Sequence, residues 1–231
     1  MSDIADNLAR VRARVERAAR AAGRPHATVA VLAVSKAHGP ERVRAAYAAG
    51  QRLFGESYVQ EALAKLDALS DLDADWHFIG PIQSNKTKLI ATRFDWVHSI
   101  DRLKIAQRLS DQRPDDRPPL NVCLQVNVSG EASKSGSPPE QVAELAPALA
   151  ALPGLRLRGL MAIPAPGPEL GRQRAAFARV RLLLDGLNQA GLGLDTLSMG
   201  MSGDLEAAIL EGATIVRVGT AIFGPRETAR E

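Results

Sequence analysis

The sequence has a single cysteine, Cys123, among its 231 residues, which excludes an internal disulfide and a four-cysteine zinc site. It has no run approaching the roughly 20 apolar residues of a membrane span. The N-terminus lacks the apolar core of a signal peptide. The four histidines show no metal-ligand spacing, and neither an HExxH motif nor a P-loop is present. These absences argue against a disulfide-rich secreted protein, a membrane protein and a metalloprotease.

The sequence also lacks a large excess of charge of either sign, since it has 29 basic and 26 acidic residues and a net charge of +3. Nucleic-acid binding requires Lys and Arg clustered along one face, so this small excess gives no reason to expect it. The N-terminus is amphipathic and Arg-rich like a transit peptide, but Asp3, Asp6 and Glu16 argue against import. We therefore expect a cytoplasmic protein that binds neither nucleic acid nor a membrane.

What the sequence does contain is a regular alternation of short apolar runs with amphipathic segments. Apolar and β-branched runs predict eight strands, at residues 28–35, 52–54, 76–79, 94–98, 120–126, 155–163, 194–198 and 214–218. Between them, seven helices are predicted at residues 40–49, 57–69, 84–91, 102–111, 138–152, 169–190 and 204–211. This order is typical of βα repetition and a parallel sheet.

Eight such units in about 200 residues predict an α/β fold, a lean (β/α)8 TIM barrel near the lower size limit of that fold. A doubly wound open sheet is the alternative. The runs at 29–34 and 214–218 are continuous rather than alternating, as expected of strands covered on both faces. No composition shift or long linker divides the chain, so we expect residues 1–231 to form a single domain.

An additional helix is predicted at the N-terminus, before the first strand. Ile4, Leu8, Val11, Val15 and Ala18 recur at steps of three and four, which is typical of one buried helical face. A second series lies mostly off that stripe and is interpreted as a solvated face, namely Arg10, Arg14, Arg17 and Arg20.

Lys36 follows the first predicted strand directly, after Ser35. In parallel barrels, functional side chains cluster at the carboxyl ends of the strands. A lysine that leaves an apolar strand end is partly desolvated, which makes its amine more nucleophilic toward carbonyl groups. The alternative is a lysine whose charged end reaches water at the start of a loop.

The loops after the seventh and eighth strands contain the second candidate feature. Barrel phosphate sites are typically formed by these two loops. Gly200, Gly203 and Gly219 allow backbone N–H groups to approach an anion closely, and Ser202 and Thr220 add hydroxyl groups. Alternatively, Ser202 caps the following helix and the glycines only form turns.

Arg217 interrupts the last apolar run, where an unpaired charge would be costly to bury, so it needs a partner or a ligand. An ion pair with a neighbouring strand is the structural alternative. A reactive amine, an anion cradle and a buried guanidinium at one end of one barrel suit pyridoxal 5′-phosphate (PLP). Its aldehyde reacts with lysine, and its phosphate needs an anion site.

Eight short motifs stand out together: Ala33-Val34-Ser35-Lys36, Phe54-Gly55-Glu56, His77-Phe78-Ile79-Gly80, Gln83-Ser84-Asn85-Lys86, Ser133-Lys134-Ser135-Gly136, Arg158-Gly159-Leu160-Met161, Ser198-Met199-Gly200-Met201-Ser202 and Arg217-Val218-Gly219-Thr220-Ala221-Ile222-Phe223-Gly224. They resemble the motifs of the pyridoxal phosphate homeostasis protein family, whose fold resembles the N-terminal barrel of alanine racemase. The resemblance runs from about residue 4 to residue 226.

The resemblance implies that Lys36 carries PLP as a Schiff base and that Arg217 faces the pyridine nitrogen. It also implies that the phosphate is held by the two loops, through Ser202, Gly203, Gly219 and Thr220. The family is associated with vitamin B6 balance and has no established catalytic turnover. It further implies a monomer, with apo-forms of PLP enzymes as possible partners. The sequence departs from the family pattern at Ser57, where Asn is common, and at Gly203, where a larger residue is frequent.

The residues also suggest why turnover would be weak. A guanidinium stays charged, so it does not readily protonate the pyridine nitrogen, and the cofactor becomes a weaker electron sink. The chain ends at Glu231, which we expect to leave no room for a second, acid/base domain, and Tyr58 is only a weak candidate for such a role. An amino-acid racemase of the same barrel type is the alternative function, and a Schiff-base aldolase acting on a sugar phosphate is a weaker one.

The remaining polar residues are interpreted as structural. His77 and His98 fall near strand ends and are read as ordinary hydrogen-bonded histidines, with a polar contact near the site as the alternative. Cys123 is read as a small buried residue. Lys134 is read as a solvated lysine in the loop at 129–139, although from there it would be able to reach over the barrel mouth.

Overall fold

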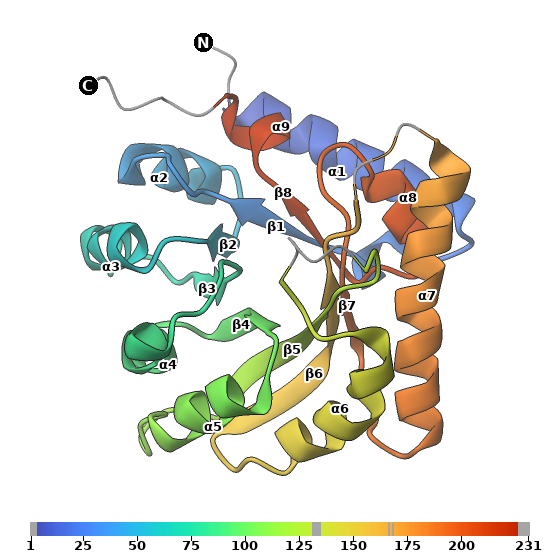
Figure 1. Cartoon of the computed structure of the whole chain (residues 1–231). Coiled ribbons are helices and arrows are strands. Elements are labelled where there is room, and N and C mark those ends of the chain that lie inside the picture. Colours follow the sequence, from blue (N-terminus) through green and yellow to red (C-terminus); the bar gives the residue numbers. More distant parts are fainter. Residues whose placement is uncertain (1–3, 131–134, 166, 168, 226–231) are drawn as a thin grey trace.

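Figure 1 shows the computed structural model, which describes residues 4–130, 135–165, 167 and 169–225. Eight parallel strands follow one another in chain order around a closed barrel. They are β1 (Ala30–Val34), β2 (Leu53–Glu56), β3 (Asp75–Phe78), β4 (Trp96–Ile100), β5 (Leu120–Val126), β6 (Leu155–Ala162), β7 (Thr196–Ser198) and β8 (Ile215–Val218). Each apolar run predicted as a strand overlaps one of them, so the predicted α/β TIM barrel is confirmed.

The pairing of the last strand with the first closes the barrel. Ala30 lies opposite Ile215, and Ala33 lies opposite Val218, in parallel register. A doubly wound open sheet would leave both edge strands unpaired on one side. That alternative is therefore wrong.

Helices surround the strands in the described part of the chain. They are α1 (Ile4–Ala21), α2 (Pro40–Ala48), α3 (Val59–Ala68), α4 (Thr87–Arg93), α5 (Leu103–Asp111), α6 (Val142–Ala150), α7 (Leu170–Gln189), α8 (Leu205–Leu210) and α9 (Thr220–Phe223). The seven predicted inter-strand helices correspond to α2 to α8. The predicted starts at 84 and 138 belong instead to short 3-10 turns, Ser84–Lys86 and Pro139–Gln141. The four-residue α9 was not predicted.

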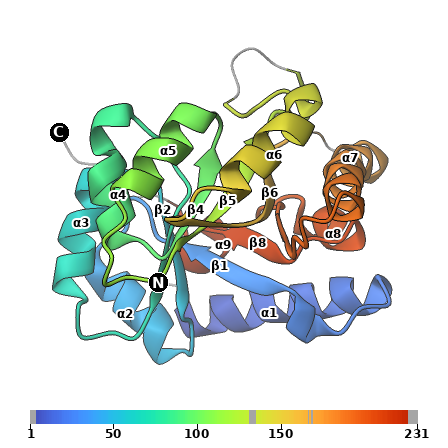
Figure 2. The same ribbon diagram turned by 90° about the horizontal axis from the view of Figure 1, so that it is seen from below.

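The predicted N-terminal helix is α1, which packs against α2, α8 and α9 and lies along β1 in Figure 2. Its stripe of Leu8, Val11 and Val15 is at most 4% exposed. The predicted solvated face is wrong for Arg14, which donates to both carboxylate oxygens of Glu206 at 2.8 and 2.9 Å. Arg14 also donates to the carbonyl oxygen of Ser202, so this helix supports the loop after β7.

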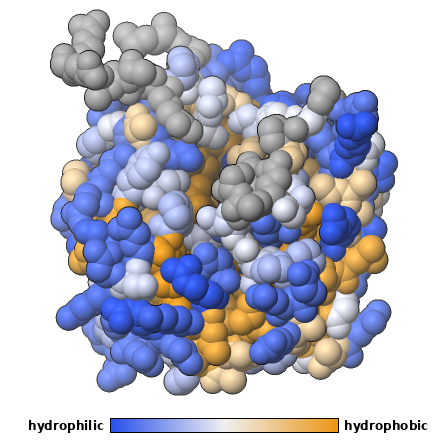
Figure 3. Space-filling model, in the orientation of Figure 1, coloured by the Kyte–Doolittle hydropathy of each residue, from blue (hydrophilic) through white to orange (hydrophobic). Residues whose placement is uncertain are grey.

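The main apolar core lies between the strands and the surrounding helices. Hydrophilic residues cover much of the face in Figure 3, with apolar ones visible between them. Cys123 on β5 is fully buried as predicted, and burial raises the pKa of its thiol to about 12. Among the described residues, no helix is both long and apolar enough to cross a bilayer. Lys134 lies outside the described residues.

Candidate functional site

The predicted site residues lie on three segments that leave neighbouring strands at the carboxyl end of the barrel. Lys36 follows β1, Ser202 lies between β7 and α8, and Gly219 lies between β8 and α9. β8 pairs with both β1 and β7, so the three segments are adjacent. Two contacts confirm this: the N–H of Arg217 donates to the carbonyl of Gly200 at 2.9 Å, and a Cβ on Gly219 would lie 3.2 Å from the Val34 carbonyl.

Lys36 is half-buried and occupies a central position of a tight turn. The N–H of His38 donates to the carbonyl of Ser35 at 3.1 Å and closes this turn. Ala37, the second central residue, has a φ of 60°. A positive φ at that position is the mark of a type II turn and is unusual for a residue with a Cβ.

The loops after β7 and β8 present unused backbone donors. Within the described chain, the N–H groups of Ser202, Gly203, Gly219 and Thr220 donate to no acceptor. Successive free amides in a loop or turn are the donors that anion-binding sites use. The four residues predicted to hold an anion thus keep the donors that such a role requires.

The glycines of the first loop differ in what the structure requires of them. Gly200 has a φ of +93°, and a Cβ there would lie 2.6 Å from the Cβ of Ala208, so only glycine fits. A Cβ on Gly203 would meet nothing within 4 Å. The reading of Ser202 as a helix cap is wrong, because Asp204 precedes α8 and its carboxylate accepts from the N–H of Met201 at 2.6 Å.

Arg217 is 4% exposed, and its hydrogen-bond partners are neutral oxygens on neighbouring strands. Nη1 donates to the carbonyl and the hydroxyl of Ser198 at 2.6 and 2.8 Å, and Nη2 donates to the carbonyl of Ala162 at 2.9 Å. The predicted alternative of an ion pair is therefore wrong within the described chain. Burial without a carboxylate partner lowers the pKa of Arg217 to about 10, so the guanidinium stays charged at neutral pH.

A chain of hydrogen bonds continues from Arg217 across the barrel interior. Nδ1 of His98 lies 2.7 Å from the Ser198 hydroxyl, and its Nε2 lies 2.9 Å from Nδ1 of His77. Because Arg217 can only donate, the Ser198 hydroxyl accepts from it. Nε2 of His98 and Nδ1 of His77 share one hydrogen bond, so one ring donates while the other accepts, and the two tautomers are coupled. The network joins β4 and β7, which are not neighbours.

Both histidines are neutral for the same physical reason. Burial lowers the pKa of His77 to about 3. Burial also lowers the pKa of His98 well below its ordinary value, and the neighbouring His77 and Arg217 lower it further. The prediction of ordinary hydrogen-bonded histidines is confirmed, but their connection to Arg217 through Ser198 was not foreseen.

The sequence is similar to proteins of known family along nearly its whole length. A family model described as alanine racemase, N-terminal domain, matches residues 7–227. The pyridoxal phosphate homeostasis protein of Pseudomonas aeruginosa is 67% identical over 227 residues, which cover 98% of this chain and 97% of that protein. The protein of the same name from Escherichia coli K12 is 51% identical over 234 residues, which cover 100% of both. This chain belongs to the pyridoxal phosphate homeostasis protein family.

Solved structures agree with this family membership. PipY of Synechococcus elongatus PCC7942, with PLP bound, is 39% identical and superimposes with a TM-score of 0.83, covering 96% of this chain and 100% of PipY. Alanine racemase from Corynebacterium glutamicum is 20% identical with a TM-score of 0.70, and the match covers 99% of this chain and 62% of the racemase. The second likeness shows the shared barrel fold alone.

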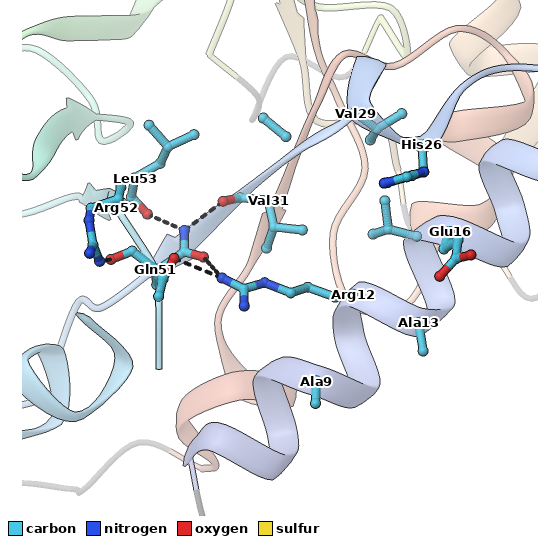
Figure 4. A pocket seen from close by; sticks show the side chains of 13 residues that line it. Ala9, Arg12, Ala13, Glu16, His26, Val29, Val31, Gln51, Arg52 and Leu53 are labelled. Carbon is cyan, nitrogen blue, oxygen red and sulfur yellow. Dashed lines mark hydrogen bonds between the residues drawn. The ribbon is translucent and has the colours of Figure 1, made fainter. Parts of the chain in front are cut away.

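A hollow of about 560 Å³ lies at the opposite, amino-terminal end of the barrel, between α1 and the starts of β1 and β2 (Figure 4). Two of its polar side chains are already paired with backbone carbonyls. Arg12 donates to the carbonyls of Ala49 and Gly50 at the end of α2, and the Gln51 amide donates to the carbonyls of Val31 and Leu53. These two side chains therefore make structural contacts between α1, α2 and the strands.

Other candidates add little to the site. Within the described chain, no group of His, Cys, Asp and Glu side chains is arranged to hold a metal ion. Tyr58 precedes α3 and is 54% exposed. Ser57 is buried against the loop after β3, since a Cβ on Gly80 would lie 2.0 Å from the Ser57 carbonyl.

Proposed function

We propose that this protein binds PLP as a Schiff base on Lys36 and takes part in vitamin B6 homeostasis by storing or delivering PLP, without catalytic turnover of its own. The observation that carries the proposal is that Lys36 and four unused backbone N–H groups lie on segments that leave neighbouring strands at the same end of the barrel. The name of the relatives and the PLP bound to PipY support it.

The donor set fits the chemistry of PLP. Lys36 would supply the amine, and the amides of Ser202, Gly203, Gly219 and Thr220 would bind the phosphate, with Gly200 giving the loop its shape. Arg217 would face the pyridine nitrogen, held in place by Ser198 and Ala162. When bound, PLP supplies a reactive aldehyde and a conjugated electron sink.

The same residues favour holding over turnover. Arg217, whose pKa of about 10 keeps it charged, is a poor proton donor to a ring nitrogen, so an electron sink at this site stays weak. Tyr58, the nearest tyrosine to the mouth along the chain, is exposed and lacks the fixed position that an acid/base needs. An amino-acid racemase remains the second candidate function, because the barrel has the alanine racemase fold.

Reduction with borohydride tests the core of this proposal. We expect PLP-saturated protein to give one phosphopyridoxyl adduct, located at Lys36 by peptide mass mapping, and the Lys36→Ala variant to give none. Stoichiometric modification of a different lysine, or no adduct in the wild-type protein, would overturn the proposal. A protein that lacked the visible PLP chromophore but turned over a sugar phosphate would indicate an aldolase instead.

Two further measurements separate the storage role from catalysis. In the first, PLP-loaded protein is incubated with the apo-form of a PLP enzyme and a competitor that traps free PLP. The activity of that enzyme recovers in the presence of the competitor if PLP is delivered directly. Recovery only without the trap would indicate a passive reservoir. Sustained loss of optical rotation from an L-amino acid, abolished by Lys36→Ala, would favour the racemase. We also propose that the chain forms a single domain that acts as a cytoplasmic monomer, which analytical ultracentrifugation tests.

A further inference from the structure

A buried ionic cluster lies directly beneath the turn that carries Lys36. Its centre is Lys65 on α3, whose side chain is 3% exposed. Nζ of Lys65 donates to Oε1 of Glu56 at 2.6 Å, to Oε1 of Glu61 at 3.1 Å and to the carbonyl oxygen of Ser35 at 2.8 Å. The Ser35 hydroxyl donates to the same Glu56 oxygen at 2.6 Å. All three hydrogens of the ammonium group are thus used, one of them on the backbone next to Lys36.

The cluster also holds the backbone on the other side of Lys36. Oε1 of Glu61 accepts a hydrogen bond from the N–H of Ala37 at 2.7 Å. The Ser35 carbonyl belongs to the peptide group before the Cα of Lys36, and the Ala37 N–H belongs to the peptide group after it. Lys65 and Glu61 therefore fix both peptide planes that set the direction of the Lys36 side chain.

The second of these planes is in an unfavourable orientation. Among the described residues, Ala37 is the one non-glycine residue with a positive φ, at 60°. Such a conformation persists only where the surroundings over-determine it, and it is most often found at functional sites. A flip of the peptide between Lys36 and Ala37 would relieve the strain, but it would turn the N–H away from the Glu61 carboxylate. Glu61 therefore selects the strained turn over the relaxed one.

Stability alone does not account for this cluster. A buried ion pair loses much of its attraction to desolvation, and apolar residues of similar size often stabilise a fold as well. Here Oε2 of Glu56 is buried without a hydrogen-bond partner, which adds to that cost. What an apolar replacement would not supply is a pair of hydrogen bonds to the two peptide groups that flank Lys36.

We propose that Glu61 and Lys65 are positioning residues for Lys36: they hold the two peptide groups around it so that its amine is presented to the carbonyl group of a bound ligand. This inference rests on the proposed role of Lys36 as the residue that holds PLP. Neither residue touches the ligand; both act through the backbone of the turn.

The test compares Glu61→Leu with the conservative Glu61→Gln, whose amide oxygen still accepts from the Ala37 N–H. Hydrogen exchange of the Ala37 amide, measured by NMR on PLP-free protein, reports the turn without any cofactor. The visible absorbance of the lysine adduct reports PLP affinity. We expect Glu61→Leu to speed exchange at Ala37 and to weaken PLP binding, each by about tenfold, because it removes a hydrogen bond to a charged acceptor. Glu61→Gln should restore both to within about threefold.

Glu211→Leu is the control, because Glu211 is likewise a carboxylate paired with basic side chains, Arg174 and Arg181, and at 6% exposure it is less exposed than Glu61 at 33%. It lies between α8 and β8, at the opposite end of the barrel from Lys36. We expect this variant to lower stability but to leave Ala37 exchange and PLP affinity unchanged. Glu61→Asp, which keeps the charge but is one methylene too short, should behave like Glu61→Leu and is used if the latter does not fold.

The possible results separate this inference from the proposed function. If wild-type protein forms no adduct at Lys36, the proposed function fails, whatever the turn does. If wild type forms the adduct and Glu61→Leu matches it in both measurements, the positioning role is overturned while PLP binding stands. Equal losses in Glu61→Leu and Glu211→Leu would also overturn it, because they would reflect general destabilisation.

Discussion

Nε2 of His98 lies 2.9 Å from Nδ1 of His77, at the far end of a hydrogen-bonded chain that starts at Arg217. The two side chains are at most 1% exposed, and the ring of His77 stacks on Trp96 with an interplanar angle of 6°. The Nε2 atom of His77 has no hydrogen-bond partner in the described chain. A proton added to either ring would therefore meet another histidine, and beyond it an arginine, without a carboxylate nearby.

This pair predicts that the protein loses stability on mild acidification. Folding lowers the pKa of His77 from 6.5 to about 3 and that of His98 in the same direction, so the unfolded chain binds more protons as the pH falls. The stabilisation is fully present above pH 6.5 and declines toward pH 3. Between pH 7 and pH 5 we expect His77 to contribute a loss of about 2 kcal/mol, and His98 to add a loss in the same direction, measured by urea unfolding.

Two variants show whether these histidines are responsible. In His77→Asn, the side-chain amide can still hydrogen-bond with His98, so the fold is kept while one titrating group is removed, and the pH dependence should become weaker. His26→Gln, at an exposed position, should leave the dependence unchanged. An unaltered slope in His77→Asn would show that other groups govern the acid response.

The strands were the part of this fold most readily predicted from the sequence. The predicted strand at 120–126 coincides with β5, because a short run rich in Val and Leu that follows a proline pair is typical of a strand. β2 was placed two residues short, since Gly55 and Glu56 resemble a turn in the sequence. Glu56 instead continues the strand by pairing with Phe78 on β3, and its buried carboxylate is paired with Lys65, nine residues later on α3. α9 is too short to produce a periodic pattern.

The candidate site was predicted unevenly, for a similar reason. Lys36 and the two loops could be predicted from the sequence, because a residue that directly follows a strand lies at the carboxyl end of a parallel barrel. Their supporting partners come from elsewhere: Lys65 reaches Ser35 from 30 residues away, and Ser198 reaches His98 from 100. The only local signal was the spacing of Glu61 and Lys65, four residues apart on one helical face. That spacing is common on surface helices, so it did not indicate a buried cluster.

The two glycines of the loop after β7 should respond differently to the same substitution. Gly200→Ala forces a Cβ to within 2.6 Å of Ala208 at a φ of +93°, and we expect a loss of about 2–4 kcal/mol in unfolding free energy. Gly203→Ala has open space and should change stability by less than about 0.5 kcal/mol. It also keeps its backbone N–H, so PLP affinity should persist, and a large loss of affinity there would contradict an amide-based phosphate site.

Arg14 connects the N-terminal helix to the same loop, through the Ser202 carbonyl and Glu206. We expect Arg14→Leu to loosen the loop and so to lower its affinity for inorganic phosphate about threefold to tenfold. This affinity is measured by the competition of inorganic phosphate with PLP. Arg20→Leu is the control on the same helix, because Arg20 is 79% exposed and, among the residues that the structure describes, pairs only with Glu16. Equal phosphate competition in both variants would show that α1 does not support the anion loop.

A comparison of Arg217 with Arg113 separates the proposed role of Arg217 beside the pyridine nitrogen of PLP from the effect of burying an arginine. Both are buried, at 4% and 8% exposure, and both donate to backbone carbonyls, those of Arg113 being on Ala91, Phe94 and Pro118. A lysine at either position cannot span these acceptors, so each Arg→Lys variant should lose about 2 kcal/mol of unfolding free energy. Only Arg217→Lys should shift the visible absorption of protein-bound PLP, because only Arg217 lies beside the proposed site. An unchanged spectrum in Arg217→Lys, with PLP still bound at Lys36, would place the pyridine nitrogen elsewhere.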